Sequence, residues 1–234
     1  YQKEIQELVQ NLERINATTK KISENQSGEF RIAYVSSTFS GDISSLIQYL
    51  SNQYPYVNFR LYEVPTVKQI AALEEGKIDF GIIRAPLHSP KIDSHLWFKD
   101  SFSLVFNRND YSITSEADLE QLKTATFVFF NKQYAPYFYD SLLEICAQYG
   151  FKPKVVHESN NISSIIQLVK NGLGISIVPT AIMKSHNYPE LEFLELKKAD
   201  HFTDILLVTP KGNPSEISKA AIQFLTKQNI KDEY

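Results

Sequence analysis

Cysteine is almost absent from this chain of 234 residues, which contains only Cys146. A single cysteine excludes a disulfide within the chain and any paired-cysteine zinc or redox motif, and it agrees with a reducing compartment. The five histidines form no HExxH motif and no close set of metal ligands, and the chain has neither a GxSxG motif nor a P-loop. We therefore expect no metal, no cofactor and no enzymatic activity.

Long apolar runs are missing as well. No run approaches the ~20 residues that a membrane span requires, and no signal peptide is visible, so we expect a cytoplasmic protein with no membrane partner. The net charge of -3 and the pI of about 6.0 do not give this chain the basic surface that nucleic-acid binding normally needs. Hydrophobic residues (43%) and charged residues (22%) occur in the proportions of an ordinary globular protein.

The first 22 residues show the spacing of a heptad repeat. Steps of four and three residues alternate along Tyr1, Ile5, Leu8, Leu12, Ile15, Thr19 and Ile22. We predict an amphipathic helix over residues 1–24 that pairs with another chain, and the alternative is a surface helix packed on its own domain. The polar stretch 23–29, which contains Gly28, predicts a linker.

Strands and helices are predicted to alternate from residue 30 onward. The predicted strands are 30–35, 57–64, 80–84, 102–107, 126–130, 154–157, 175–178, 191–196 and 204–209. The predicted helices are 41–53, 67–75, 118–122, 137–149, 162–171 and 215–227. This alternation predicts an α/β fold with largely parallel sheets. Because the length exceeds one five-stranded sheet, we expect two subdomains, 28–102 plus 204–234 and 103–203, joined by crossover strands near 102–107 and 201–209.

Two longer motifs carry a resemblance to a known family. The runs 61–63 (LYE), Thr66 and 72–84 (ALEEGKIDFGIIR), together with 168–179 (LVKNGLGISIVP), resemble the effector-binding region of LysR-type transcriptional regulators. Residues 30–35 (FRIAYV) and the Ser/Thr cluster that follows supply the expected opening strand, and the match covers about residues 28–230 in the correct order. The likeness is nearest to the branch that responds to aromatic compounds.

The resemblance implies a fold and a set of partners. It implies two Rossmann-like subdomains of type 2 periplasmic-binding-protein architecture, with residues 1–24 as the linker helix that precedes them. It also implies a homodimer or homotetramer, and a small-molecule effector, expected to be an organic acid. The family's winged helix-turn-helix is missing from this sequence, so DNA binding is implied only for the intact protein.

Polar residues follow the predicted strands at the place where open α/β sheets bind ligands, beyond the carboxyl ends of the strands. Ser36, Ser37 and Thr38 follow the first strand, and Thr66 precedes the next helix. Their hydroxyls can donate hydrogen bonds to a carboxylate, or they can serve only as helix caps. The resemblance favours a ligand contact for Ser37 and Thr66.

An aromatic loop, 131–139 (NKQYAPYFY), follows the predicted strand 126–130. Its rings can line a pocket for a flat apolar body, or they can belong to the core. The resemblance ranks Pro136 and Phe138 above Tyr134 and Tyr137 as effector contacts, and Asn131 opens the same loop. Asn161 and Ile162 lie between a strand and a helix of the second subdomain and complete the predicted site.

Arg84 ends an otherwise apolar strand. Its guanidinium can clamp an effector carboxylate, or it can pair internally with a carboxylate such as Asp100. The related branch carries a second arginine near the position of Ser101, which this sequence lacks. Two function classes remain: an effector-sensing domain of a transcription regulator, and a type 2 solute-binding protein of a transporter, which shares the architecture.

Overall fold

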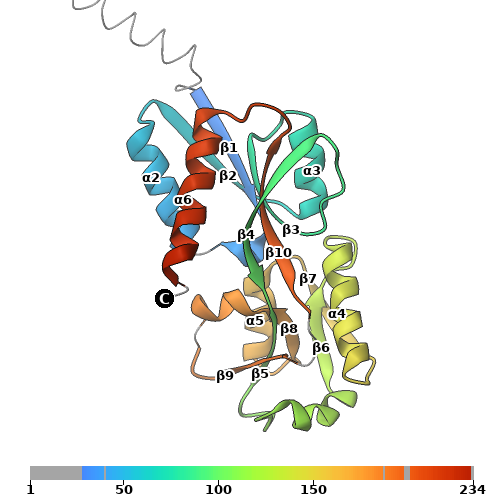
Figure 1. Ribbon diagram of the computed structural model, residues 1–234. Coiled ribbons are helices and arrows are strands. Elements are labelled where there is room, and N and C mark those ends of the chain that lie inside the picture. Colours follow the sequence, from blue (N-terminus) through green and yellow to red (C-terminus); the bar gives the residue numbers. More distant parts are fainter. Residues whose placement is uncertain (1–27, 40, 187, 198–200, 233–234) are drawn as a thin grey trace, which may run out of the picture.

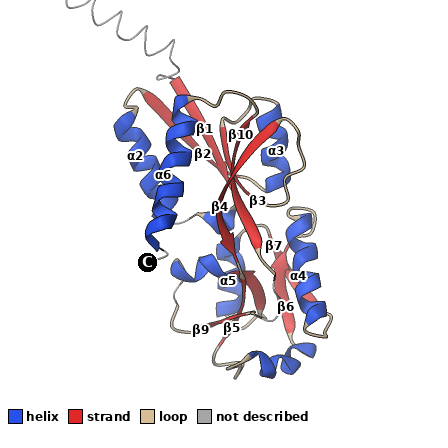
Figure 2. Ribbon diagram, viewed as in Figure 1, coloured by secondary structure: helices blue, strands red, loops and turns tan. Residues whose placement is uncertain are grey.

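The computed structural model describes residues 28–39, 41–186, 188–197 and 201–232. The predicted helix over residues 1–24 lies outside these ranges. Two groups of strands, each covered by helices, stack end to end (Figures 1 and 2). We call them the upper half and the lower half, as they are placed in Figure 1.

The upper half is built on one mixed sheet of five strands, in the order β2-β1-β3-β10-β4. The strands are β1 (Gly28–Tyr34), β2 (Val57–Glu63), β3 (Phe80–Arg84), β4 (Ile92–Asp100) and β10 (Thr203–Pro210). β1 pairs in parallel with β2 and β3, whereas β10 runs antiparallel to β3 and β4. Helices α2 (Gly41–Gln53) and α6 (Glu216–Asp232) cover one face of the sheet, and α3 (Thr66–Glu74) covers the other (Figure 2).

The lower half holds the remaining strands. β5 (Phe102–Asn107) lies between β8 (Ser176–Pro179) and β9 (Leu191–Glu195) and is antiparallel to both. The parallel pair β6 (Thr126–Phe130) and β7 (Lys154–Ser159) joins this sheet through a bridge between Phe127 and Ile175. Helices α4 (Pro136–Gln148) and α5 (Ile162–Lys170) flank these strands. The described residues also form three 3-10 helices: η1 (Ser36–Thr38) follows β1 of the upper half, whereas η2 (Glu116–Lys123) and η3 (Thr180–Lys184) belong to the lower half.

The alternation of side-chain directions along β5 explains why helices cover both faces of the lower sheet. Along β5, Leu104 and Phe106 pack in the cluster that contains Leu142 of α4, whereas Val105 packs in the cluster that contains Ile165 of α5. Successive side chains of a strand point to opposite faces, so an apolar run such as β5 needs cover on both sides. The side chains of all six β5 residues are accordingly buried.

The chain passes between the halves at two neighbouring places. It leaves the upper half at the end of β4, where Ser101 separates Asp100 from Phe102, and it returns at the start of β10. β4 and β10 pair along their whole length, from Thr203 opposite Asp100 to Pro210 opposite Ile92. The two strands therefore lie side by side through the junction and form a two-stranded ribbon (Figure 1).

The predicted α/β class, the long strands and five of the six predicted helices are confirmed, with ends that differ by a few residues. The predicted helix 118–122 forms instead as the 3-10 helix η2. The expectation of largely parallel sheets is wrong, because both larger sheets contain antiparallel pairs. The strand β4 was missed since its polar side chains, among them Asp93, Ser94 and Lys99, interrupt any apolar run. It forms as an edge strand, where the outer side is open to solvent.

Candidate functional site

A pocket of about 560 Å³, counting the part open to solvent, lies between the two halves. The upper half contributes the residues that follow β1 and β2 and the end of β3, and the lower half contributes the β6–α4 connection. The lining consists of Val35, Ser36, Ser37, Pro65, Thr66, Val67, Arg84, Ala85, Phe130, Tyr134, Ala135, Pro136, Tyr137 and Phe138.

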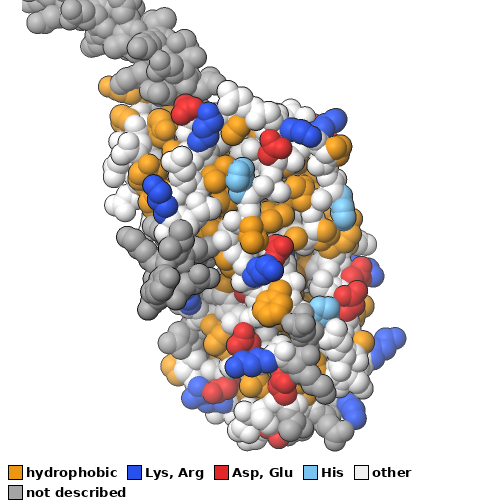
Figure 3. Space-filling view, in the orientation of Figure 1, with side chains coloured by type: hydrophobic (Ala, Val, Ile, Leu, Met, Phe, Trp, Pro, Cys, Tyr) orange, Lys and Arg blue, Asp and Glu red, His pale blue; other side chains and the backbone are white. Residues whose placement is uncertain are grey.

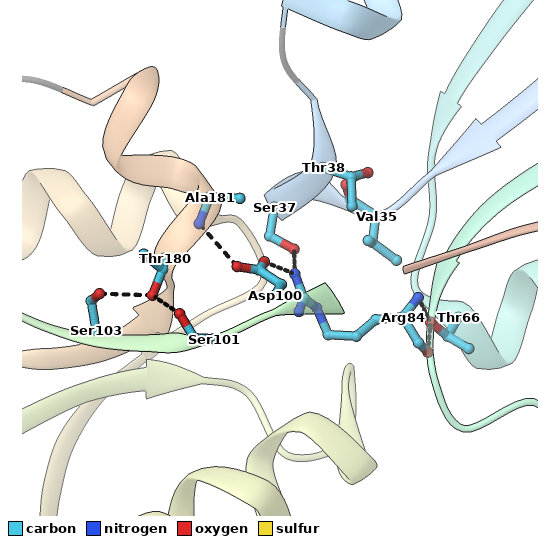
Figure 4. A network of polar contacts seen from close by, with 10 residues as sticks. All are labelled: Val35, Ser37, Thr38, Thr66, Arg84, Asp100, Ser101, Ser103, Thr180 and Ala181. Carbon is cyan, nitrogen blue, oxygen red and sulfur yellow. Dashed lines mark hydrogen bonds and ion pairs between the residues drawn. The ribbon is translucent and has the colours of Figure 1, made fainter. Parts of the chain in front are cut away.

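Arg84 lies in this pocket as the last residue of the buried strand β3. Its Nη2 donates hydrogen bonds to Ser37 Oγ at 3.1 Å and to Asp100 Oδ2 at 3.2 Å (Figure 4). The predicted internal pair with Asp100 is therefore confirmed. The other oxygen of Asp100, Oδ1, accepts from the backbone N–H of Ala181 at 3.0 Å, so this carboxylate connects Arg84 to η3 of the lower half.

Burial and the charge of Asp100 act in opposite directions on the pKa of Arg84. Desolvation lowers the pKa of its guanidinium, and the charge and hydrogen bond of Asp100 raise it. The group stays protonated because an arginine side chain does not lose its proton in proteins. Its Nη1 is buried and has no hydrogen-bond partner among the described residues, and the guanidinium carbon lies 5.5 Å from the centre of the Phe138 ring. The pocket thus contains a cation with one donor group unused.

Two hydroxyls contact Arg84, one at its guanidinium and one at its backbone. Thr66 Oγ1 accepts from the backbone N–H of Arg84 at 3.2 Å and donates to its carbonyl at 3.1 Å, which fixes the end of β3 against the start of α3. Ser37 Oγ accepts from Arg84, so its own hydrogen remains for a second partner. The first N–H groups of α3 have no carbonyl partner within the helix, and that end of a helix favours negative charge.

Aromatic rings form the wall on the side of the lower half. Phe138 packs edge-to-face on Phe130, with ring centres 5.1 Å apart, and lies 5.8 Å from Phe102 in a tilted arrangement. These contacts hold the Phe138 ring in place by core packing, while the residue also lines the pocket. Tyr134 and Tyr137, which the sequence ranked lower, line it as well.

The structure brings six of the predicted site residues into the lining: Ser36, Ser37, Thr66, Arg84, Pro136 and Phe138. The other four lie outside the lining. Thr38 is buried and donates to the Val35 carbonyl, and Ile162 is a core residue of the lower half. Asn131 donates to Glu158, and Asn161 caps α5 while donating to Glu63.

Sequence reasoning missed the apolar part of the lining, namely Val35, Pro65, Val67, Ala85, Phe130 and Ala135. These residues carry no chemical signature of their own. Each lies within two positions of a predicted site residue, which is the signal that could have found them.

The described residues contain no group of three or more His, Cys, Asp or Glu side chains that could hold a metal ion. Among the same residues, no helix is both long enough and apolar enough to pass through a membrane.

Known proteins with similar sequences are transcriptional regulators. CatR of Pseudomonas putida, an HTH-type transcriptional regulator, is 26% identical over 217 residues, which cover 93% of this chain and 74% of CatR. YnfL of Escherichia coli strain K12, an uncharacterized HTH-type transcriptional regulator, is 29% identical over 211 residues, which cover 89% of this chain and 70% of YnfL.

A solved structure, that of the BenM effector binding domain with its effector benzoate, matches with a TM-score of 0.73 at 21% identity. The match covers 88% of this chain and 94% of that one, and it confirms the type 2 periplasmic-binding-protein fold. These matches favour a regulator over a solute-binding protein or an enzyme. The model of the LysR substrate binding domain matches residues 23–229, so the chain belongs to the LysR substrate-binding domain family.

Proposed function

We propose that this effector-binding domain senses a small metabolite that carries a carboxylate, and that it does so in the pocket between its two halves. The observation that carries the proposal is the unused Nη1 of Arg84, a buried cationic donor in a pocket otherwise lined by apolar and neutral polar groups. A buried polar group without a partner is costly, and a carboxylate is the ligand group that relieves this cost best.

The lining supports one orientation of such an effector. Its carboxylate accepts from Arg84 Nη1 and from the Ser37 hydroxyl, close to the N-terminus of α3 at Thr66. Its apolar body packs against the Phe138 ring and Pro136. The relative whose structure matches, BenM, has benzoate as its effector, and a single aromatic ring with one carboxylate suits this lining.

The same family membership supports the wider function. In the intact cytoplasmic regulator, effector binding alters the geometry of a homodimer or homotetramer and thereby changes promoter binding. The DNA contact belongs to an HTH domain outside this one. Lys and Arg side chains alternate with Asp and Glu on the face in Figure 3, so the described part of that face offers no basic patch for DNA.

Calorimetric titration with benzoate tests the effector site. We expect binding to the wild-type chain, and we expect Ser37→Ala to weaken it about 10- to 150-fold, the loss of one hydrogen bond to a charged group. Thr226→Ala is the matched control, because it removes a hydroxyl that bonds only within α6. Equal affinities of the wild type and Ser37→Ala, or no binding by either, would contradict the proposed site.

A further inference from the structure

The pocket has a single cation with which to bind negative charge. Arg84 is the one charged residue among the described residues of its lining, and Asp100 already shares its charge. The nearby Lys132 lies outside the lining, where it pairs with Asp140 at 3.0 Å and lies over the Tyr139 ring. A second carboxylate on an effector would therefore meet no positive partner in the lining.

A carboxylate lies instead at the rim of the pocket, just outside its lining. Glu63 ends the edge strand β2, two residues before Pro65 of the lining. In the sheet order β2-β1-β3, Glu63 and Arg84 belong to strands that are two spacings apart, or about 10 Å. An aromatic ring with substituents at opposite ends extends over most of that length.

Glu63 is held in this place by the other half of the molecule. Its Oε1 accepts a hydrogen bond of 2.7 Å from Nδ2 of Asn161, and the Oδ1 of Asn161 caps α5 by accepting from Ser163 N and Ser164 N. The amide of Asn161 is thereby fixed at both ends. Since an amide carries no charge, the hydrogen bond positions the negative charge of Glu63 without neutralising it.

The charge of Glu63 acts on a residue of the lining. The pKa of the Tyr134 phenol is raised, first by burial and then by the negative charge of Glu63. Tyr34, which pairs with Glu63 in the β1–β2 register, responds in the same way. The electrostatic influence of Glu63 thus extends from the rim to the wall of the pocket.

We infer that Glu63 is a specificity-determining residue, which makes the site select monocarboxylates and reject dicarboxylates. This inference rests on the proposed function, in which the first carboxylate binds Arg84. The far end of the effector then lies toward Tyr134 and Glu63, where a second negative charge is repelled and an uncharged group is accepted. Rejection by an unfavourable charge is an ordinary means of specificity.

Two ligands of nearly equal shape test the inference: 4-methylbenzoate, and benzene-1,4-dicarboxylate, in which a carboxylate replaces the methyl group. We expect the wild-type chain to bind 4-methylbenzoate at least about fivefold more tightly than benzene-1,4-dicarboxylate, which is the effect of one unit charge at about 4 Å in water. The ratio of these two affinities is the quantity compared between variants. Glu63→Gln keeps an oxygen acceptor for Asn161 but removes the charge, and we expect it to reduce this ratio about fivefold.

Glu29→Gln is the matched control for net charge. Glu29 lies near the other end of β1, five residues or about 17 Å from the strand position opposite Glu63, and it pairs with Arg60. In Glu29→Gln, the ratio of the two ligand affinities should equal that of the wild type. Equal binding of the two ligands by the wild type, or an unchanged ratio in Glu63→Gln, would overturn the inference and leave the proposed function standing. Failure of both ligands to bind would overturn both.

Discussion

Arg84 and Asp100 form an ion pair whose side chains are only 7% and 3% exposed, with Nη2 and Oδ2 3.2 Å apart. The pair joins the end of β3 to the end of β4, and its second carboxylate oxygen reaches η3 through Ala181 N. One buried carboxylate therefore holds Arg84, the crossing strand and the lower half together. An effector that binds Arg84 acts on the group that connects both halves.

Breaking this pair should be costly for the fold. Asp100→Ala leaves the Arg84 guanidinium buried without a countercharge, and we expect it to lower the free energy of unfolding by about 3–5 kcal/mol. Urea denaturation measures this loss. Glu29→Ala, which removes the exposed partner of Arg60, should cost at most about 1 kcal/mol. Similar losses in the two variants would show that the buried pair has no special role.

The glycine at position 174 should be required by close contact with a neighbouring strand. Its φ is +136°, and a Cβ there would lie 2.6 Å from the carbonyl oxygen of Thr126. We expect Gly174→Ala to cost more than Gly150→Ala by about 1–3 kcal/mol, because Gly150 also has a positive φ but has open space around it. Thermal unfolding of both variants compares them, and equal losses would contradict the steric argument.

Helices and buried strands could be predicted because their patterns are local. The apolar run of β5 and the glycine that ends α3, Gly76 with a φ of +66°, are visible in the sequence. β4 was not visible because its stability comes from pairing with β10, more than a hundred residues away in the chain. A strand that depends on its partner carries little signal of its own.

The candidate site likewise contains residues that local patterns predict and contacts that they do not predict. Ser37, Thr66, Arg84 and Phe138 were predicted because they follow strands or match a family motif, and they lie together in the lining. The bond between Asn161 and Glu63 connects residues 98 positions apart, and the bond from Asp100 to Ala181 connects residues 81 apart. Contacts of this kind follow from the packing of the two halves, which no local pattern encodes.

Cys146 should be unreactive in the folded protein. Burial raises the pKa of its thiol to about 12, so at pH 8 the thiolate that reacts with disulfide reagents is nearly absent. We expect slow labelling of the native chain by a thiol reagent at pH 8, and rapid labelling in urea. Rapid labelling without denaturant would contradict the packed position of Cys146 in α4.

The same raised pKa predicts the direction of a pH dependence. The folded state favours the protonated thiol, so this contribution to stability is complete below the unfolded pKa of about 8.5 and is lost as the pH rises toward about 12. Between pH 8 and pH 10, the wild type should therefore lose more stability than Cys146→Ala. Urea denaturation at both pH values measures the difference, and parallel losses would exclude Cys146 as its source.

Effector binding should shift the domain toward the conformation described here, in which the halves are in contact through Asn161 and Glu63. In the proposed site, Ser37 and Arg84 of the upper half and Phe138 of the lower half line one pocket, so we expect an effector to gain its full contacts only when the halves approach. A ligand shifts a conformational equilibrium by its difference in affinity for the two states, typically about 1–3 kcal/mol of coupling. We expect the β4–β10 ribbon to be the connection that bends.

Small-angle scattering with and without saturating benzoate measures this closure, and we expect a smaller radius of gyration in the bound sample. Ser37→Ala at a benzoate concentration that saturates only the wild type is the control, since it should scatter like the unbound chain. Sedimentation of the same samples should show an unchanged number of subunits, because we expect closure to change the geometry of an oligomer without releasing its subunits. Identical scattering at saturation, or dissociation to monomers, would contradict closure as the response to the effector.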